Sequence, residues 1–80
     1  MIRARVTVTL KKGVLDPQGK AIEGALAALG FGAIEDVRQG KVFDFRLKGS
    51  SKKKAEGELT EMCEKLLANT VIEDFEVEIL

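Results

Sequence analysis

IRARVTVTLK, residues 2–11, alternates strictly between apolar and polar side chains. One side of this stretch carries Ile2, Ala4, Val6, Val8 and Leu10, and the other carries Arg3, Arg5, Thr7, Thr9 and Lys11. Successive side chains of a β-strand point to opposite faces of a sheet, so the pattern predicts a strand with one buried face.

A helix is predicted to begin soon after the strand. Asp16 offers a side-chain oxygen for an N-cap, and Pro17 suits the first helical position, where a backbone N–H is not needed. The apolar residues that follow at helical spacing are Ile22, Ala25, Leu26 and Leu29. They form one stripe, which is expected to lie over a core, and Gly30 suits a left-handed helix end.

Two extended runs are predicted between residues 34 and 47, separated by Gly40. A glycine accepts positive φ angles, so Gly40 is interpreted as the turn of a hairpin. Beyond it, Phe43, Phe45 and Leu47 share one face of a strand.

A second helix and a last strand complete the chain. Ser50 or Ser51 is expected to cap the helix, and Asn69 to close it. Its apolar stripe consists of Ala55, Leu59, Met62, Cys63, Leu66 and Leu67, and the final strand places Phe75, Val77 and Ile79 on one side. The three lysines at 52–54 are interpreted as a solvated corner, because glutamates follow them at once.

These elements predict a single domain over residues 1–80 with an α+β fold. The order βαββαβ is that of ferredoxin-like proteins, a two-layer arrangement in which two helices cover one face of an antiparallel sheet. The first and last strands are usually neighbours in this arrangement. Arg3 and Arg5 would then stand near Asp74, Glu76 and Glu78 on the outer face of the sheet.

The composition indicates a small domain that associates with itself. The 80 residues include 13 basic and 13 acidic side chains, so the formal net charge is zero and no nucleic acid is indicated as a partner. A small core and weak mutual repulsion favour an oligomer. The chain has one cysteine and shows neither a signal-peptide pattern nor a membrane span, which predicts a cytoplasmic protein.

Residues suited to catalysis are sparse. The sequence has no histidine, the commonest general base and metal ligand, and its glycines fit neither a P-loop nor a dinucleotide-binding motif. Cys63 lies within an apolar stripe and is expected to be a core residue, and no second cysteine accompanies it. The residues therefore predict no catalytic, cofactor-binding or metal site in this chain.

Three segments resemble the PurS family, the small subunits of phosphoribosylformylglycinamidine synthase. They are VLDPQG at 14–19, EDVRQGK at 35–41 and EMCEKLLANTVIEDFEV at 61–77. The resemblance implies a non-catalytic subunit in purine biosynthesis that bridges a large ATP-dependent synthetase subunit and a glutaminase subunit. Such a bridge would support ammonia transfer from glutamine to formylglycinamide ribonucleotide. ATP and magnesium would bind to the synthetase subunit, and the small subunit would form a homodimer or higher homo-oligomer.

The positions that match the family motifs supply the candidate interface residues: Asp16, Gln18, Arg38, Lys41 and Asn69. Asp16 and Asn69 also have structural interpretations, as a helix cap and as a left-handed residue after a helix. A turn does not require cations, and arginine is favoured where interface carboxylates are bound. Arg38 and Lys41 are therefore predicted to contact a partner subunit.

Two other functions remain open for this topology on the residues alone. One is a dimeric regulatory domain that binds a small ligand between its subunits. The other is a small hydrolase of acyl phosphates, which would need an anion-binding loop with an arginine after the first strand. Lys11, Lys12 and Gly13 are a poor substitute for such a loop.

Overall fold

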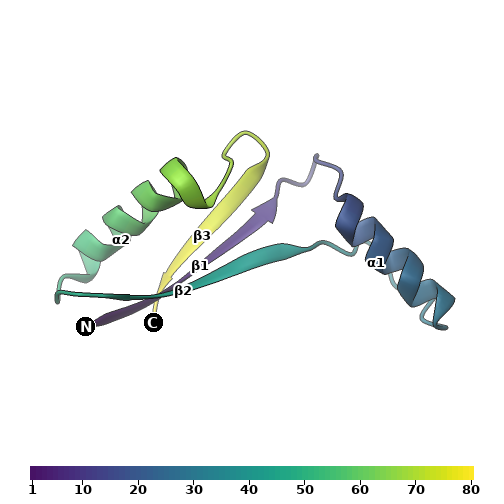
Figure 1. The fold of residues 1–80 in the computed structure, drawn as a ribbon, viewed down its shortest axis with the longest axis horizontal. Coiled ribbons are helices and arrows are strands. Elements are labelled where there is room, and N and C mark those ends of the chain that lie inside the picture. Colours follow the sequence, from purple (N-terminus) through teal and green to yellow (C-terminus); the bar gives the residue numbers. More distant parts are fainter.

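The computed structural model describes residues 1–80 as a three-stranded antiparallel sheet with two helices (Figure 1). The elements are β1 (Ile2–Leu10), α1 (Pro17–Ala28), β2 (Gly40–Leu47), α2 (Lys52–Met62), a π-helical turn η1 that extends α2 (Cys63–Leu67), and β3 (Glu73–Ile79). The strand order is β2-β1-β3, so the first and last strands are neighbours. The predicted α+β class and the predicted neighbourhood of the first and last strands are confirmed.

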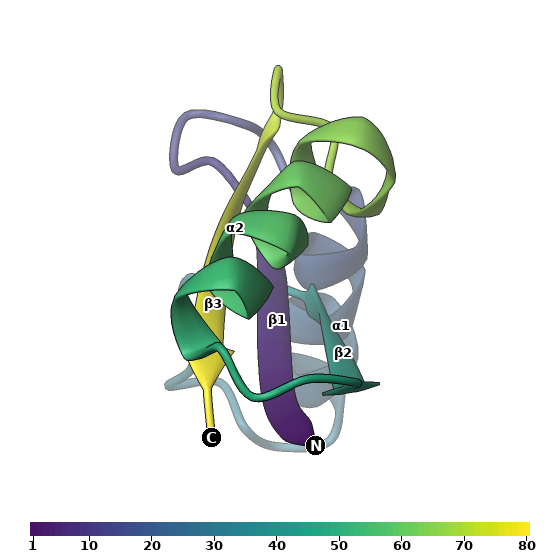
Figure 2. The ribbon, with the colours of Figure 1, turned by 90° about the vertical axis from the view of Figure 1, so that its left-hand side faces the viewer.

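The core lies between the sheet and α2. Alternate residues of β1 and one face of α2 and η1 supply most of its fully buried apolar side chains, namely Ile2, Ala4, Val6, Val8, Ala55, Leu59 and Cys63. Half-buried side chains of β2 and β3, Phe43 and Phe75 among them, pack around this cluster. Figure 2 shows α2 lying across one face of the sheet. The prediction that Cys63 is a core residue is confirmed, and of the two predicted caps for α2, Ser50 and Ser51, the structure has Ser51.

The prediction that both helices cover one face of the sheet is wrong for α1. Figure 1 shows α1 projecting beyond the end of the sheet, so that the molecule measures 49 × 24 × 14 Å. Its radius of gyration is 16.0 Å, compared with about 12 Å for a compact chain of this length. Leu29, at the end of the predicted apolar stripe, is 73% exposed. Amphipathic spacing alone does not determine which sheet a helix covers.

The predicted hairpin at Gly40 is also wrong. No strand lies between α1 and Gly40, which is the first residue of β2 and pairs with Thr9 of β1. A Cβ at this position would lie 2.8 Å from the backbone oxygen of Val8, so glycine serves close approach between the strands here. The segment before it contains Asp36 at a φ of 56°, which interrupts any extended run.

The outer face of the sheet carries the expected charges with one difference. Arg5 stands opposite Glu78 of β3 and forms an ion pair with Asp44 of β2, at 2.8 Å from Nε to Oδ1. Arg3 has no acidic neighbour across the strands, because it stands opposite Arg46. This pair of like charges departs from the predicted complementarity.

Candidate functional site

The first two sequence motifs meet at the end of the sheet from which α1 projects. They surround a depression of about 380 Å³. The residues that line it are Val8, Leu10, Asp16, Gln18, Gln39, Gly40, Lys41 and Glu73. We call this region the motif junction. It unites residues that lie up to 65 positions apart, from Val8 to Glu73.

Asp16 joins the two motifs through both of its carboxylate oxygens. Oδ1 accepts a hydrogen bond from the backbone N–H of Gly19 at 2.9 Å, which caps α1 as predicted. Oδ2 accepts one from the N–H of Gln39 at 2.8 Å. The bond from Gln39, then that from Gly19, lowers the pKa of this carboxyl, and the charge of Arg38 acts in the same direction against the effect of burial. Asp16 therefore holds the start of β2 against the start of α1.

Gly19 is the point of closest approach between the motifs. A Cβ on this residue would overlap the backbone oxygen of Val37 and lie 2.9 Å from Asp16 Oδ2. Only glycine lets the segment before β2 rest directly on the first turn of α1. This contact fixes the direction in which α1 leaves the sheet.

Arg38 stabilises the turn between β1 and α1. Its Nη2 donates hydrogen bonds to the backbone oxygens of Lys11 and Val14, at 2.9 and 2.8 Å. The residue as a whole remains exposed. The predicted interface arginine thus has an intramolecular role as well, which sequence reasoning did not detect.

Lys41 and Asn69 meet at Glu73, the first residue of β3. Lys41 Nζ lies 3.8 Å from Glu73 Oε2. The backbone N–H of Asn69 donates to Glu73 Oε1 at 2.7 Å, and Asn69 Oδ1 accepts from the N–H of Val71 at 3.2 Å. Asn69 therefore shapes the turn into β3, and its φ is not positive, so the left-handed interpretation is wrong.

All five candidate interface residues lie at or beside the motif junction. Asp16 is buried, whereas Gln18 and Lys41 are exposed and Gln18 makes no side-chain hydrogen bond. Sequence reasoning missed Gln39, which contributes only its backbone, and Glu73, which links Lys41 to Asn69. Both residues lie inside quoted motifs, Gln39 in the second and Glu73 in the third, and this position was the available signal.

Chemically reactive groups do not gather at the junction or elsewhere. No group of three or more histidine, cysteine, aspartate or glutamate side chains is arranged to hold a metal ion. Burial raises the pKa of the Cys63 thiol, and the charge of Glu64 adds to the effect, so this sulfur is a poor nucleophile. Neither helix is long and apolar enough to span a membrane.

Comparison with known proteins agrees with the sequence motifs. The sequence model of PurS, described as phosphoribosylformylglycinamidine (FGAM) synthase, matches residues 3–80. The chain belongs to the PurS family. The PurS subunit of the synthase from Methanocaldococcus jannaschii is 44% identical over 79 residues, which are 99% of this chain and 95% of that one. The PurS subunit from Bacillus subtilis is also 44% identical, over 99% of this chain and 93% of its own length.

Solved PurS structures share the fold along the whole chain. The crystal structure of M. jannaschii PurS, one of the subunits of formylglycinamide ribonucleotide amidotransferase, superposes with a TM-score of 0.90 at 42% identity. It covers 100% of this chain and 96% of that one. A chain in the structure of PurLQS from Thermotoga maritima gives a TM-score of 0.89 at 30% identity, covering 99% and 96%. PurS membership is therefore favoured over the ligand-binding and hydrolase alternatives.

Proposed function

We propose that this chain is the non-catalytic small subunit of phosphoribosylformylglycinamidine synthase and bridges its larger subunits. The observation that carries the proposal is membership of the PurS family over residues 3–80. A similar chain of known structure comes from PurLQS of T. maritima. The lack of histidine and the buried state of Cys63 agree with a subunit that assembles rather than catalyses.

In the proposed complex, the glutaminase subunit releases ammonia and the synthetase subunit uses it. ATP and magnesium bind to the synthetase subunit, where they activate the amide oxygen of formylglycinamide ribonucleotide. Ammonia that escapes into water is protonated and lost to the reaction, so the two active sites need a fixed and sealed alignment. This chain supplies that alignment. By the same proposal, it lies in the cytoplasm with the rest of the complex.

The shape of the chain supports a homo-oligomer in which α1 covers a second copy. The apolar stripe of α1 has no sheet beneath it, and Leu29 and Ile22 are exposed. Beside α2 lies an open groove of about 440 Å³, lined by Phe45, Glu58, Glu61, Met62, Lys65, Leu66 and Leu67. The predicted βαββαβ fold would place a second helix beside α2 on this face of the sheet. The α1 helix of a second copy has the apolar stripe to fill it, and the exchange would bury both surfaces.

The motif junction is proposed to contact a larger subunit. Gln18 and Lys41 have exposed side chains there, and Arg38 keeps donors free besides the Nη2 that holds the turn. Asp16 and Asn69 act indirectly. The hydrogen bonds of Asp16 join the first turn of α1 to the segment before β2, and that of Asn69 shapes the turn before β3. The surface is polar, as expected for a contact between subunits that also exist separately.

The test is glutamine-dependent amidine formation by the synthetase and glutaminase subunits, with and without this chain, together with sizing of the mixture. We expect activity and a three-component peak only when the chain is present. Lys41→Ala should weaken assembly, whereas Lys20→Ala is the matched control, because Lys20 is also an exposed, ion-paired lysine but lines neither the motif junction nor the groove beside α2. Full activity and an unchanged elution profile without the chain would refute the proposal.

A further inference from the structure

The unpaired cations of this protein gather at one end. Of its 13 lysines and arginines, five form ion pairs within 4.0 Å, and Arg38 is bonded to backbone oxygens. Of the remaining seven, all except Lys12 lie at this end of the molecule. The other six are Arg3, Arg46, Lys48, Lys52, Lys53 and Lys54. We call these six residues the basic end.

The fold, rather than the sequence, brings these residues together. Arg3 at the start of β1 stands directly opposite Arg46 at the end of β2. The segment that follows β2 carries Lys48 to the start of α2, and both Lys48 and Lys54 line a depression there. Figure 1 shows the N-terminus and the start of α2 at the end of the molecule farthest from α1.

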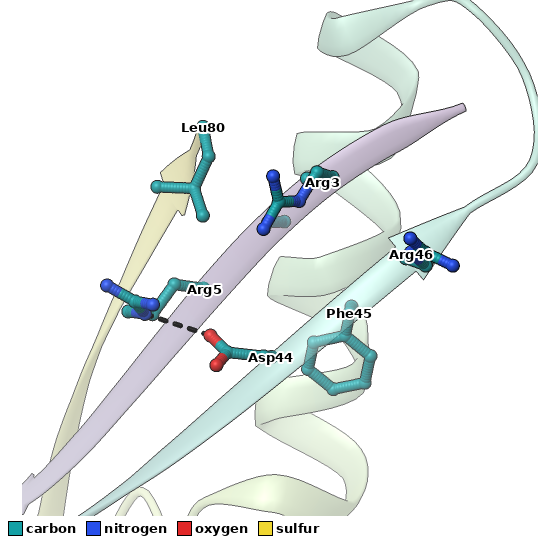
Figure 3. Close-up of a pocket in the computed structure, with 7 residues that line it drawn as sticks. Arg3, Arg5, Asp44, Phe45, Arg46 and Leu80 are labelled. Carbon is teal, nitrogen blue, oxygen red and sulfur yellow. Dashed lines mark hydrogen bonds and ion pairs between the residues drawn. The ribbon is translucent and has the colours of Figure 1, made fainter.

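The outer face of the sheet has an exposed cationic depression at this end. It measures about 360 Å³ and is lined by Arg3, Ala4, Arg5, Asp44, Phe45, Arg46 and Leu80. In Figure 3, Asp44 is joined to Arg5 by an ion pair, while Arg3 and Arg46 have no such partner. Two guanidinium groups are therefore left without a carboxylate.

Folding alone does not favour this arrangement. Like charges directly opposite one another on neighbouring strands are destabilising. The carboxylates next along α2, Glu56 and Glu58, form no ion pair with the basic end. The chain has as many acidic as basic residues, so the concentration of unpaired cations is local and does not reflect a surplus of positive charge.

We infer that the basic end docks onto an acidic surface of one of the two larger subunits of the synthase. This inference rests on the proposed function and adds a second contact, remote from the motif junction. The cations stand on a strand pair, a loop and a helix, and spread-out charges of this kind suit a protein surface with several carboxylates. Arginine binds carboxylates in bidentate fashion, and steering by such charges accelerates association at low salt.

Stability measurements separate an interface role from a structural one. Replacing Arg3 and Arg46 together by glutamine removes a repulsion, so the melting temperature of the isolated chain should stay equal or rise. A structural role predicts the opposite result. Lys12→Gln is the matched control, because it neutralises the one unpaired lysine outside the basic end.

The decisive measurement is the affinity of the chain for the purified larger subunits between about 50 and about 300 mM salt, a range over which the Debye length falls from about 14 Å to about 6 Å. The Arg3→Gln, Arg46→Gln variant should bind about 10-fold more weakly, chiefly through slower association, and with a shallower salt dependence. Lys12→Gln should bind as the original chain does. Unchanged affinity and salt dependence in the double variant would overturn the inference while leaving the proposed function intact.

Two other results of the binding measurements would also overturn the inference. If the original chain does not bind the larger subunits at all, the proposed function fails and the inference fails with it. If the double variant keeps its subunit affinity but loses binding of a labelled single-stranded RNA, the basic end belongs to nucleic acid and the inference is overturned.

Discussion

Replacement of Gly19 by alanine should destabilise this protein, although alanine is ordinarily the better helix former. A Cβ at this position would lie 2.9 Å from Asp16 Oδ2 and 3.0 Å from the carbonyl carbon of Val37, and closer still to the Val37 oxygen. Overpacking of this kind costs about 1 to 3 kcal/mol. The gain in helix propensity offsets about 0.5 to 1 kcal/mol of that cost. The net loss is up to about 2 kcal/mol.

Gly24 provides the matched control on the same helix. No atom lies within 4 Å of a Cβ built there, so Gly24→Ala should stabilise the protein by about 0.5 to 1 kcal/mol. The two variants should thus differ by about 1 to 3 kcal/mol. For a domain of this size, 1 kcal/mol shifts the melting temperature by about 4 to 8 °C, so the Gly24 variant should melt at least about 4 °C higher.

Circular dichroism melts at one protein concentration measure this difference, because self-association makes melting temperatures depend on concentration. Equal melting temperatures for Gly19→Ala and Gly24→Ala would refute the reasoning. They would mean that the Val37 carbonyl does not rest on α1, and the account of how α1 is held away from its own sheet would lose its basis.

Three further outcomes are expected. Leu59→Ala should lower the free energy of unfolding by about 2 to 5 kcal/mol, because this fully buried side chain is central to the core. The loss should appear as a lower midpoint of urea denaturation. Leu29→Ser should raise the self-association Kd about 30-fold to 1,000-fold by sedimentation, since covering this 73% exposed leucine in two copies contributes about 2 to 4 kcal/mol. Val71→Ser, an equally exposed site outside α1, should leave the Kd unchanged. The lowered pKa of Asp16 means that its carboxylate stabilises the fold fully above the ordinary aspartate pKa of about 4 and loses that effect as the pH falls through the folded value. Asp16→Asn should therefore melt lower than the original chain at pH 6, and the difference should shrink at pH 3.

Local structure was predictable from the sequence because its causes are local. Alternation along residues 2–11 identified the first strand, and Asp16 was recognised as a helix cap from its place before Pro17. That β1 and β3 are neighbours followed from the usual strand order of this topology. Each of these inferences depends on residues within a few positions or on a rule about neighbouring strands.

The placement of α1 and the role of Gly40 were not predictable in the same way. Glycine permits both a turn and the close approach of another strand, and only the pairing of Gly40 with Thr9 distinguishes them. The second hydrogen bond of Asp16, to Gln39, joins residues 23 positions apart. An amphipathic stripe indicates that one face of a helix is covered, but it does not indicate whether the same chain or another chain covers that face.

The distribution of binding features along the molecule bears on what a bridging subunit needs. A bridge requires at least two contact regions that do not overlap, and this chain is 49 Å long with the motif junction toward one end and the basic end at the other. The core between them, built from β1 and α2, does not include the side chains of Lys41 or Arg46. Substitutions at one end should therefore leave the other free to act. If Lys41 and Arg46 variants each weakened binding to a different subunit, the separation of the two ends would be the physical basis of bridging.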